Sequence, residues 1–366
     1  MTQWIHTEQR RHVGVILLDR PKALNSLSLD MVRALSAILY AWRDDATIAA
    51  VLIKSSHERA FCAGGDIRFF YEAGRATPQT GSALIEDFFT EEYALNHLIH
   101  FYPKPYIAFM DGVVMGGGMG IAQAGSAARC RIVTERTKMA MPEVNIGLFP
   151  DVGGSYFLSR TPGQFGTYMA LTGETISVAD TLLAGLADYY LPSAQLPALQ
   201  AFLENASLAD WAPWPGLAGQ FCAPWQAGLD QADALLPGQA GAIEQHFGFD
   251  QMTQIVASLQ TDNSVFALQT LATMRRRSSL MQAVTLAQLR AGASMGVADC
   301  LRMERTMVRR NFEHGEVLEG VRALVIDKDN APNWSAATWE QVSPALVQSF
   351  FTPAWPAYAH PLRDLA

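Results

Sequence analysis

Hydrophobic residues in the first half of the chain form short runs that alternate with longer amphipathic segments. Residues 13–18, 49–54, 105–110 and 129–133 are apolar or β-branched and are bounded by charged or glycine-containing segments, which is typical of β-strands. Residues 28–42 instead place hydrophobic side chains on one helical face, with Ser28 and Asp30 near the start. Strands that alternate with helices predict an α/β core.

The second half of the chain has a different pattern. From about residue 196 the sequence is rich in Ala, Leu, Gln, Trp and Pro, and helical spacing recurs at residues 250–259, 265–276 and 280–290. A short apolar run at residues 323–326 is expected to be a strand. No clean sequence period supports a regular solenoid. We predict a core of residues 1–192 and a mainly helical region of residues 193–366.

Composition and charge narrow the function classes. The chain has 366 residues, of which 49% are hydrophobic and 17% charged, as in ordinary globular proteins. A net charge of -8 argues against binding to nucleic acid or to anionic membranes, although a local basic pocket for one anionic ligand stays open. No apolar run approaches the roughly 20 residues of a membrane span. Four widely spaced cysteines and a polar N-terminus lead us to expect reduced thiols and a cytoplasmic location.

Two glycine-rich segments lie between predicted strands and predicted helices. Residues 61–68 read FCAGGDIR, and residues 115–120 read MGGGMG before a helical run expected at 121–128. Glycine lets a backbone pass close to a ligand, and two N–H groups that point at one oxygen would form an oxyanion hole. Ordinary connections and close packing use glycine equally well. Neither segment has the spacing of a P-loop or of a dinucleotide-binding fingerprint.

Residues 141–155 place Glu143 and Asp151 among apolar residues, in a segment with two prolines and three glycines. Burial of a carboxylate is costly without a partner or a function, whereas an Asp before a glycine turn is also common at the surface. His97 and His100 lack a third ligand, so no metal site is predicted. No His has a position in the sequence relative to Cys62 that indicates a catalytic Cys–His pair, which disfavours a cysteine nucleophile.

Taken in order, residues 20–27 (RPKALNSL), 60–68, 115–120 and 141–154 resemble the enoyl-CoA hydratase/isomerase superfamily, also called the crotonase superfamily. This resemblance covers about residues 10–192. It implies a crotonase-like spiral of ββα repeats followed by a C-terminal helical region. Within the superfamily, the sequences MPE and GLFPDVGG look most like the 3-hydroxyisobutyryl-CoA hydrolase subgroup, and residues 312–334 extend that likeness.

The resemblance also implies roles for the motif residues. The backbone N–H groups of Gly65 and Gly117 would form the oxyanion hole, and Glu143 and Asp151 would be the catalytic carboxylates. The same likeness implies substrate contacts by Glu92, Gly116 and Gly118, and coenzyme A contacts by Lys22, Ala63, Asp66 and Ile67. Typical hydratases carry a second glutamate where Gly120 stands, so hydratase acid–base chemistry would lack one partner here.

We therefore expect hydrolysis of a short, branched 3-hydroxyacyl-CoA, first of all 3-hydroxyisobutyryl-CoA in valine degradation, to 3-hydroxyisobutyrate and coenzyme A. Coenzyme A is part of the substrate, and no metal or other cofactor is expected. We expect no nucleic-acid or membrane partner, and a homo-oligomer stays open. The alternatives are an enoyl-CoA hydratase or isomerase, and a non-catalytic acyl-CoA-binding protein.

Overall fold

The computed structural model describes residues 2–77, 81–125, 129–207, 216–229 and 234–366. The chain divides into two compact units whose segments alternate along the sequence. The sheet unit comprises Met1–Gly65, Ala94–Met139 and Ile176–Ala234, and the helical unit comprises Asp66–Tyr93, Ala140–Thr175 and Leu235–Ala366. The domain boundary expected after residue 192 stays a prediction.

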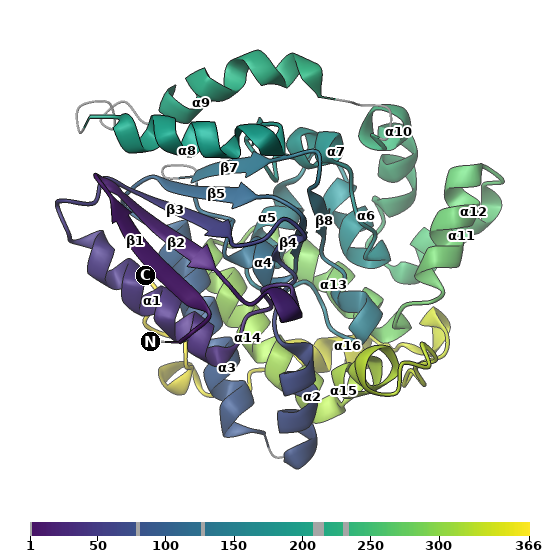
Figure 1. The fold of residues 1–366 in the computed structure, drawn as a ribbon. Helices are drawn as coiled ribbons and strands as arrows, with labels where there is room; N and C mark the ends of the chain where they lie inside the picture. Colours follow the sequence, from purple (N-terminus) through teal and green to yellow (C-terminus); the bar gives the residue numbers. More distant parts are fainter. Residues whose placement is uncertain (1, 78–80, 126–128, 208–215, 230–233) are drawn as a thin grey trace. The chain divides into compact units, whose positions relative to one another are not determined.

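A six-stranded sheet forms the centre of the sheet unit (Figure 1). Its strands, in spatial order, are β1 (Ile5–Arg10), β2 (Val13–Leu18), β3 (Ala50–Ser55), β5 (Tyr106–Met110), β7 (Arg129–Val133) and β9 (Tyr189–Tyr190). β1 is antiparallel to β2, and the other neighbouring strands are parallel. The four predicted strands are confirmed. β5 is buried along its whole length, as expected for a strand of a parallel sheet that is covered on both faces.

Helices cover this sheet within the same unit. Leu199 and Leu203 of α8 (Leu196–Asn205) pack with Cys222 of α9 (Gly216–Cys222) against the apolar side chains of the strands. In Figure 1, α1 (Leu29–Arg43) lies on the side of the sheet away from α8 and α9. α1 confirms the helix predicted at residues 28–42. Its N-cap Ser28 accepts a hydrogen bond of 3.3 Å from the N–H of Met31, which stabilises the first turn.

A second sheet contains three short strands: β4 (Ala60–Cys62), β6 (Val113–Met115) and β8 (Lys138–Ala140). Along the chain, β3 is followed by β4, β5 by β6, and β7 by β8. Each pair leads into a helical segment, namely α2 (Ile67–Ala76), α4 (Gly117–Gly120) and the 3-10 helix η2 (Glu143–Ile146). This succession of ββα repeats confirms the spiral fold class expected from the resemblance.

The helical unit contains most of the C-terminal half. Its helices are α2, the first part of α3 (Ala83–His100), α5 (Gly154–Phe157), α6 (Phe165–Thr172), α10 (Leu236–Phe247), α11 (Met252–Thr261), α12 (Val265–Met274), α13 (Ser279–Gly292), α14 (Val297–His314), α15 (Glu316–Val321) and α16 (Pro344–Phe351). The helices predicted from residue 250 to residue 290 are confirmed as α11, α12 and α13. Phe70 of α2 packs against Phe89 of α3, with ring centroids 4.9 Å apart.

The strand expected at residues 323–326 is wrong. These residues belong to a π-helical turn, η6 (Arg322–Ile326), that continues α15. The N–H of Asp327 donates a hydrogen bond of 2.8 Å to the carbonyl oxygen of Arg322, so the backbone bonds stay within the segment. A run of four apolar residues has no periodicity that separates a strand from a helical turn.

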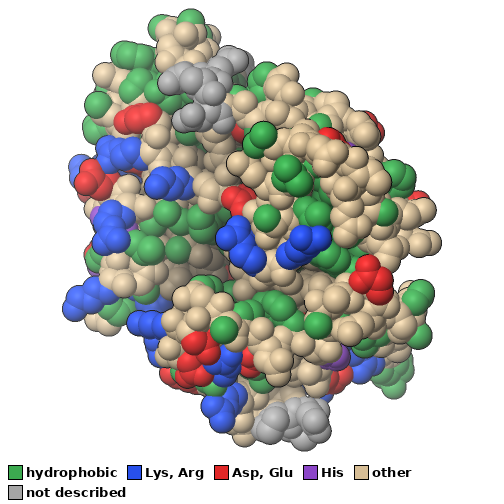
Figure 2. All heavy atoms as spheres, turned by 90° about the vertical axis from the view of Figure 1, so that its right-hand side faces the viewer, with side chains coloured by type: hydrophobic (Ala, Val, Ile, Leu, Met, Phe, Trp, Pro, Cys, Tyr) green, Lys and Arg blue, Asp and Glu red, His purple; other side chains and the backbone are tan. Residues whose placement is uncertain are grey.

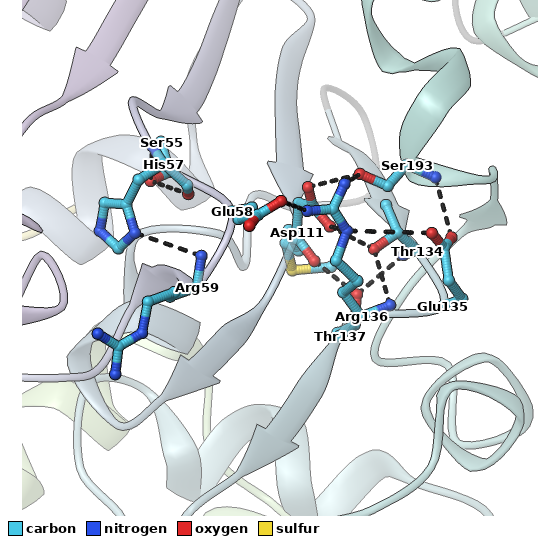
Figure 3. A network of polar contacts seen from close by, with 11 residues as sticks. Ser55, His57, Glu58, Arg59, Asp111, Thr134, Glu135, Arg136, Thr137 and Ser193 are labelled. Carbon is cyan, nitrogen blue, oxygen red and sulfur yellow. Dashed lines mark hydrogen bonds and ion pairs between the residues drawn. The ribbon is translucent and has the colours of Figure 1, made fainter.

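A polar network joins loops at the carboxyl ends of three parallel strands (Figure 3). Asp111 follows β5, Arg136 follows β7 and Ser193 follows β9. Ser193 Oγ donates to Asp111 Oδ2 at 2.8 Å, and Arg136 Nε lies 3.6 Å from Asp111 Oδ1. The network therefore holds the loop between β5 and β6 in place. β6 leads into the second glycine segment.

Charged side chains are mixed with other types on the face in Figure 2, and the helix lengths can be compared with the thickness of a bilayer. On the face in Figure 2, Lys and Arg side chains lie singly or in small groups among acidic and hydrophobic ones. Every helix of the described residues is too short or too polar to span a bilayer. That the chain binds no nucleic acid and no membrane stays a prediction.

Candidate active site

Two glycine turns meet in the sheet unit. Gly64 and Gly116 have positive φ values of 107° and 49°, which glycine adopts without steric strain. A Cβ atom on Gly64 would lie 3.3 Å from the carbonyl oxygen of Met115 and 3.7 Å from the amide nitrogen of Gly117. Gly65 follows Gly64 directly, and no backbone acceptor among the described residues takes its N–H. The structure thus brings together the two segments for which an oxyanion hole was predicted.

The second turn depends on close backbone contact. Gly117 is the first residue of α4, and its N–H therefore has no acceptor within that helix. A Cβ atom on Gly118 would lie 2.2 Å from the carbonyl oxygen of Cys62, closer than a side chain can approach. The helix expected at residues 121–128 is wrong for residues 121–125, because the helical turn α4 spans Gly117–Gly120 and ends before them. Residues 126–128 lie outside the described residues.

The motif at residues 20–27 forms hydrogen bonds with the segment that contains the first glycine turn. The side-chain amide of Asn25 donates hydrogen bonds of 3.3 and 3.0 Å to the carbonyl oxygens of Ala60 and Phe61. The N–H of Ala63 donates to the carbonyl oxygen of Leu24 at 3.0 Å. Lys22 is exposed in the same turn of the backbone, η1 (Pro21–Ala23). Lys22 and Ala63 therefore belong to neighbouring segments, and their coenzyme A contacts stay a prediction.

Asp66 and Ile67 belong to the helical unit. Asp66 is the N-cap of α2 and accepts a hydrogen bond of 3.3 Å from the N–H of Phe69, and Ile67 is the first residue of that helix. The cap gives Asp66 a local structural role. Its predicted contact with coenzyme A, like that of Ile67, is not tested by this geometry.

Three of the predicted site residues carry carboxyl groups that are buried in the helical unit. Glu143 begins η2, Asp151 follows Pro150, and Glu92 lies on α3, with exposed fractions of 6%, 5% and 2%. The hydroxyl of Tyr93 donates a hydrogen bond of 2.7 Å to Asp151 Oδ2. Oε2 of Glu143 and Oε1 of Glu92 are buried and have no hydrogen-bond partner within the described residues. Buried polar atoms in this state need an explanation, and a polar ligand is one.

Burial raises the pKa of all three groups. For Glu143 the charge of Asp151 adds to the effect of burial, and for Glu92 the charges of Asp151 and Glu143 do so. Burial raises the pKa of Asp151 to about 6, although the hydrogen bond from Tyr93 lowers it. No Lys or Arg of the described residues is among the causes of these shifts. The cluster therefore retains protons nearer to neutral pH than isolated carboxyl groups do, which suits acid–base catalysis.

The sequence analysis missed Glu304 of α14, which is fully buried. Glu304 Oε2 accepts a hydrogen bond of 2.8 Å from the N–H of Gly153, and Oε1 accepts one of 2.9 Å from the N–H of Ser155. Burial raises the pKa of Glu304 to about 8, and the charge of Asp151 contributes to the shift. Because Glu304 stands among arginines in the sequence, only its tertiary contacts distinguish it from an exposed helix residue.

Tyr93 and Asn96 of α3 were also missed. Tyr93 is fully buried and contacts Asp151 as described above. Asn96 follows Glu92 by one helical turn, and both its amide nitrogen and its amide oxygen are buried without a partner among the described residues. An unpartnered buried amide is as unusual as an unpartnered carboxylate. A helical segment that reads EEYALNH gives no signal for either residue.

The remaining candidates have no metal-binding geometry. The rings of His97 and His100 both pack near Phe101, with centroids 4.7 and 4.8 Å from its ring. No group of three or more His, Cys, Asp or Glu side chains in the described ranges could hold a metal ion. Cys62 is a buried free thiol. That the protein uses no metal stays a prediction.

Comparison with known proteins identifies the family. Residues 13–351 match the family model described as enoyl-CoA hydratase/isomerase. The chain belongs to the enoyl-CoA hydratase/isomerase family. This match extends well beyond the glycine and carboxylate motifs, and includes Tyr93, Asn96 and Glu304.

Similar curated proteins cover almost the whole chain. A 3-hydroxyisobutyryl-CoA hydrolase, mitochondrial, of Gallus gallus is 38% identical over 341 residues, which is 93% of this chain and 86% of the relative. The protein of the same name from Danio rerio is 39% identical over 343 residues, or 93% of this chain and 87% of the relative. These values show similarity to the hydrolase subgroup over both units.

Two solved structures share the fold over nearly their full length. A carnitinyl-CoA dehydratase from Mycobacterium thermoresistibile has a TM-score of 0.85 at 34% identity and covers 97% of this chain and 98% of its own. An enoyl-CoA hydratase from Rhodobacter sphaeroides 2.4.1 has a TM-score of 0.85 at 36% identity and covers 96% and 98%. The family thus includes similar chains that are named for different reactions.

Proposed function

We propose that this protein hydrolyses the thioester bond of a short, branched 3-hydroxyacyl-CoA. The first candidate substrate is 3-hydroxyisobutyryl-CoA, an intermediate of valine degradation, with 3-hydroxyisobutyrate and coenzyme A as products. The observation that carries the proposal is the buried pair Glu143 and Asp151 in a chain that has Gly120 where hydratases have glutamate. The curated relatives named as hydrolases support the same reaction.

The oxyanion hole would be formed by the N–H groups of Gly65 and Gly117. When a nucleophile attacks the thioester carbonyl, negative charge develops on its oxygen, and two fixed N–H donors stabilise that charge. Loss of one such donor costs roughly 2.7–4 kcal/mol in other enzymes. In this arrangement Gly116 and Gly118 would contact the acyl group, and the lack of a Cβ atom on Gly118 lets its backbone lie against the carbonyl oxygen of Cys62.

Glu143 would supply the attacking oxygen or activate it. In one route its carboxylate attacks the carbonyl carbon, the C–S bond breaks, and water then hydrolyses the resulting anhydride to release the acid. In the other route Glu143 removes a proton from the water that attacks the carbonyl carbon, and the C–S bond then breaks to release the acid and the thiolate. Both routes need ionised Glu143, and its raised pKa makes the ionised form a stronger base.

Asp151 and Glu92 would bind the acyl group and assist the departing thiol. Asp151, with a pKa near 6, exchanges protons close to neutral pH and can give one to the thiolate that leaves as coenzyme A. Glu92 has an unpartnered Oε1 that can accept a hydrogen bond from the substrate 3-hydroxyl group. Lys22, Ala63, Asp66 and Ile67 would contact the coenzyme A portion, and no separate cofactor takes part.

The test is release of free thiol from 3-hydroxyisobutyryl-CoA by the purified protein. Glu143→Gln keeps the shape of the side chain but removes its base, so we expect the rate to fall by about 10²–10⁴-fold. Glu174→Gln is the matched control, because Glu174 is 43% exposed and pairs with Arg277. Equal rates for wild type and Glu143→Gln would remove Glu143 from the mechanism.

A hydratase is the second candidate, because both similar solved structures are named for dehydratase or hydratase reactions. Loss of the double-bond absorbance of crotonyl-CoA without thiol release would favour it. A non-catalytic acyl-CoA-binding protein would bind thioesters tightly and turn over none of them. A panel of acyl-CoA substrates, assayed for both thiol release and double-bond absorbance, separates the three functions.

We keep one further proposal about the protein as a whole, its cytoplasmic location. The cytoplasmic location rests on the reduced cysteines, whereas the similar curated proteins are named as mitochondrial. The oligomeric state, which sedimentation can measure, stays open.

A further inference from the structure

Two polar side chains lie on the buried face of α3. Neighbouring positions on that face are apolar: Phe88, Leu95 and Ile99 are 1% exposed or less. Glu92 and Asn96 fall on the same face and are 2% and 5% exposed. Hydrophobic spacing would place apolar residues at both positions, and burial of a polar group without a partner is destabilising. Packing alone therefore does not explain either residue.

The amide of Asn96 is buried, and neither its nitrogen nor its oxygen has a hydrogen-bond partner in the part of the chain that the structure describes. The same is true of Oε1 of Glu92, four residues earlier. Residues at this spacing on a helix have Cβ atoms about 5–6 Å apart. The two side chains do not bond to each other at that spacing, so a small polar group between them can bond to both.

Tyr93 shows which part of the site this turn of α3 contacts. It follows Glu92 directly, and its hydroxyl donates a hydrogen bond of 2.7 Å to Asp151 Oδ2. Asp151 is one of the two carboxyl groups assigned to the reaction above. The unpartnered atoms of Glu92 and Asn96 therefore belong to the stretch of helix that contacts the catalytic segment, where the substrate is the natural source of a polar group.

We propose that Asn96 is a specificity-determining residue that, together with Glu92, binds the 3-hydroxyl group of the acyl chain. The inference rests on the hydrolysis proposed above, and it names the contact that selects 3-hydroxyacyl thioesters over other acyl thioesters. It gives a role to a residue that lies outside the glycine and carboxylate motifs.

A hydroxyl group suits this pair because it both donates and accepts hydrogen bonds. With Glu92 ionised, the hydroxyl donates to Oε1 of Glu92 and accepts from Nδ2 of Asn96. With Glu92 protonated, the carboxyl group donates to the hydroxyl, which in turn donates to Oδ1 of Asn96. The amide serves both cases because it carries a donor and an acceptor, so recognition of the hydroxyl does not depend on the charge of Glu92.

Asn96→Leu tests this role, because leucine has a similar size and forms no side-chain hydrogen bonds. Thiol release is measured with 3-hydroxyisobutyryl-CoA and with isobutyryl-CoA, which differs only in lacking the hydroxyl group. We expect kcat/KM to fall about 10- to 100-fold for the first thioester and to change less than about threefold for the second. The preference of the wild type for the hydroxylated substrate should shrink accordingly.

An equal fall for both thioesters would show that Asn96 only supports the fold or binds water, and would overturn the proposal. Asn96→Ala, which adds no atoms, gives the same comparison if leucine does not fit, and an unchanged substrate preference in both variants would also overturn it. Asn205→Leu is the control, because Asn205 is exposed at the end of α8 and donates to the carbonyl oxygen of Ala201. Its substrate preference should equal that of the wild type.

Binding measurements separate this inference from the proposed function. In protein that carries Glu143→Gln, calorimetric titration gives the dissociation constants of the two thioesters, and adding Asn96→Leu should remove the preference for 3-hydroxyisobutyryl-CoA. The same preference with and without Asn96→Leu would overturn the inference. If the wild type releases no thiol from any thioester, the proposed hydrolysis fails, while the binding comparison still decides whether Asn96 recognises the hydroxyl group.

Discussion

The sheet unit and the helical unit contribute to the proposed reaction in opposite ways. The sheet unit offers uncharged backbone N–H groups, and the positions of its glycine turns depend on the absence of Cβ atoms near Gly64 and Gly118. The helical unit offers carboxyl groups whose pKa is raised by burial, and no Lys or Arg of the described residues is among the causes of these shifts. The first region should therefore be sensitive to added atoms, and the second to added or removed protons.

Gly118→Ala is expected to have the largest effect, and it tests whether the sheet unit is sensitive to added atoms. The new Cβ atom would lie 2.2 Å from the carbonyl oxygen of Cys62, so the backbone that carries the N–H of Gly117 must move. We expect thiol release to fall by about 10²–10³-fold, the effect of losing one oxyanion donor. Urea unfolding should also show a lower free energy of unfolding.

Gly216→Ala, in the same unit, is the matched control for that change, because no described residue lies within 4 Å of a Cβ atom on Gly216. Its activity and stability should equal those of the wild type. Equal behaviour of Gly118→Ala and Gly216→Ala would contradict the view that backbone contact builds this region.

An intermediate effect concerns the pH dependence of stability. The folded-state pKa of Asp151 is raised from 3.8 to about 6, and that of Glu304 from 4.5 to about 8. The folded state thus binds more protons than the unfolded state between these values, and the free energy of unfolding should fall as pH rises through this window. For Asp151 alone the fall is on the order of 1–3 kcal/mol.

Urea unfolding at pH values between 5 and 8 measures this dependence. Asp151→Asn should show a smaller fall than the wild type, whereas Gly118→Ala, in the sheet unit, should keep the wild-type dependence. If the free energy of unfolding falls by the same amount in Asp151→Asn and in the wild type, the proposed difference between the two units is contradicted.

The smallest effect is expected for Tyr93→Phe. The hydrogen bond from Tyr93 to Asp151 is 2.7 Å long and lowers the pKa of Asp151, so its loss should raise that pKa. We expect kcat to fall about three- to tenfold, in line with a net hydrogen-bond value of roughly 0.5–1.5 kcal/mol. The kcat–pH profile checks the direction: a limb assigned to Asp151 should move to higher pH, and a shift to lower pH would exclude this contact.

Much of the fold was predictable from local patterns. The strand at residues 13–18 and the helix at residues 28–42 have a strong hydrophobic period and clear ends, and both are confirmed. The predictions failed where a segment was short, as at residues 323–326, or where glycine itself forms the helical turn, as at Gly117–Gly120. In these places tertiary packing outweighs local propensity.

The candidate site divides in a similar way. Glu143 and Asp151 were found because they stand in an apolar segment with an unusual motif, and the structure shows both buried. Glu304 and Asn96 were missed, because their helical segments look like ordinary polar helix surface. Their burial becomes visible only when distant segments pack against them.

By itself, the sequence determined the alternation of strands and helices, the family motifs and the carboxyl pair, because hydrophobic period and glycine spacing are local properties of the chain. Only the tertiary structure decided that the two glycine turns touch and that Glu304 contacts the turn after Asp151, about 150 residues earlier in the chain. Contacts between residues so far apart depend on packing and burial, and neither is encoded in any single segment.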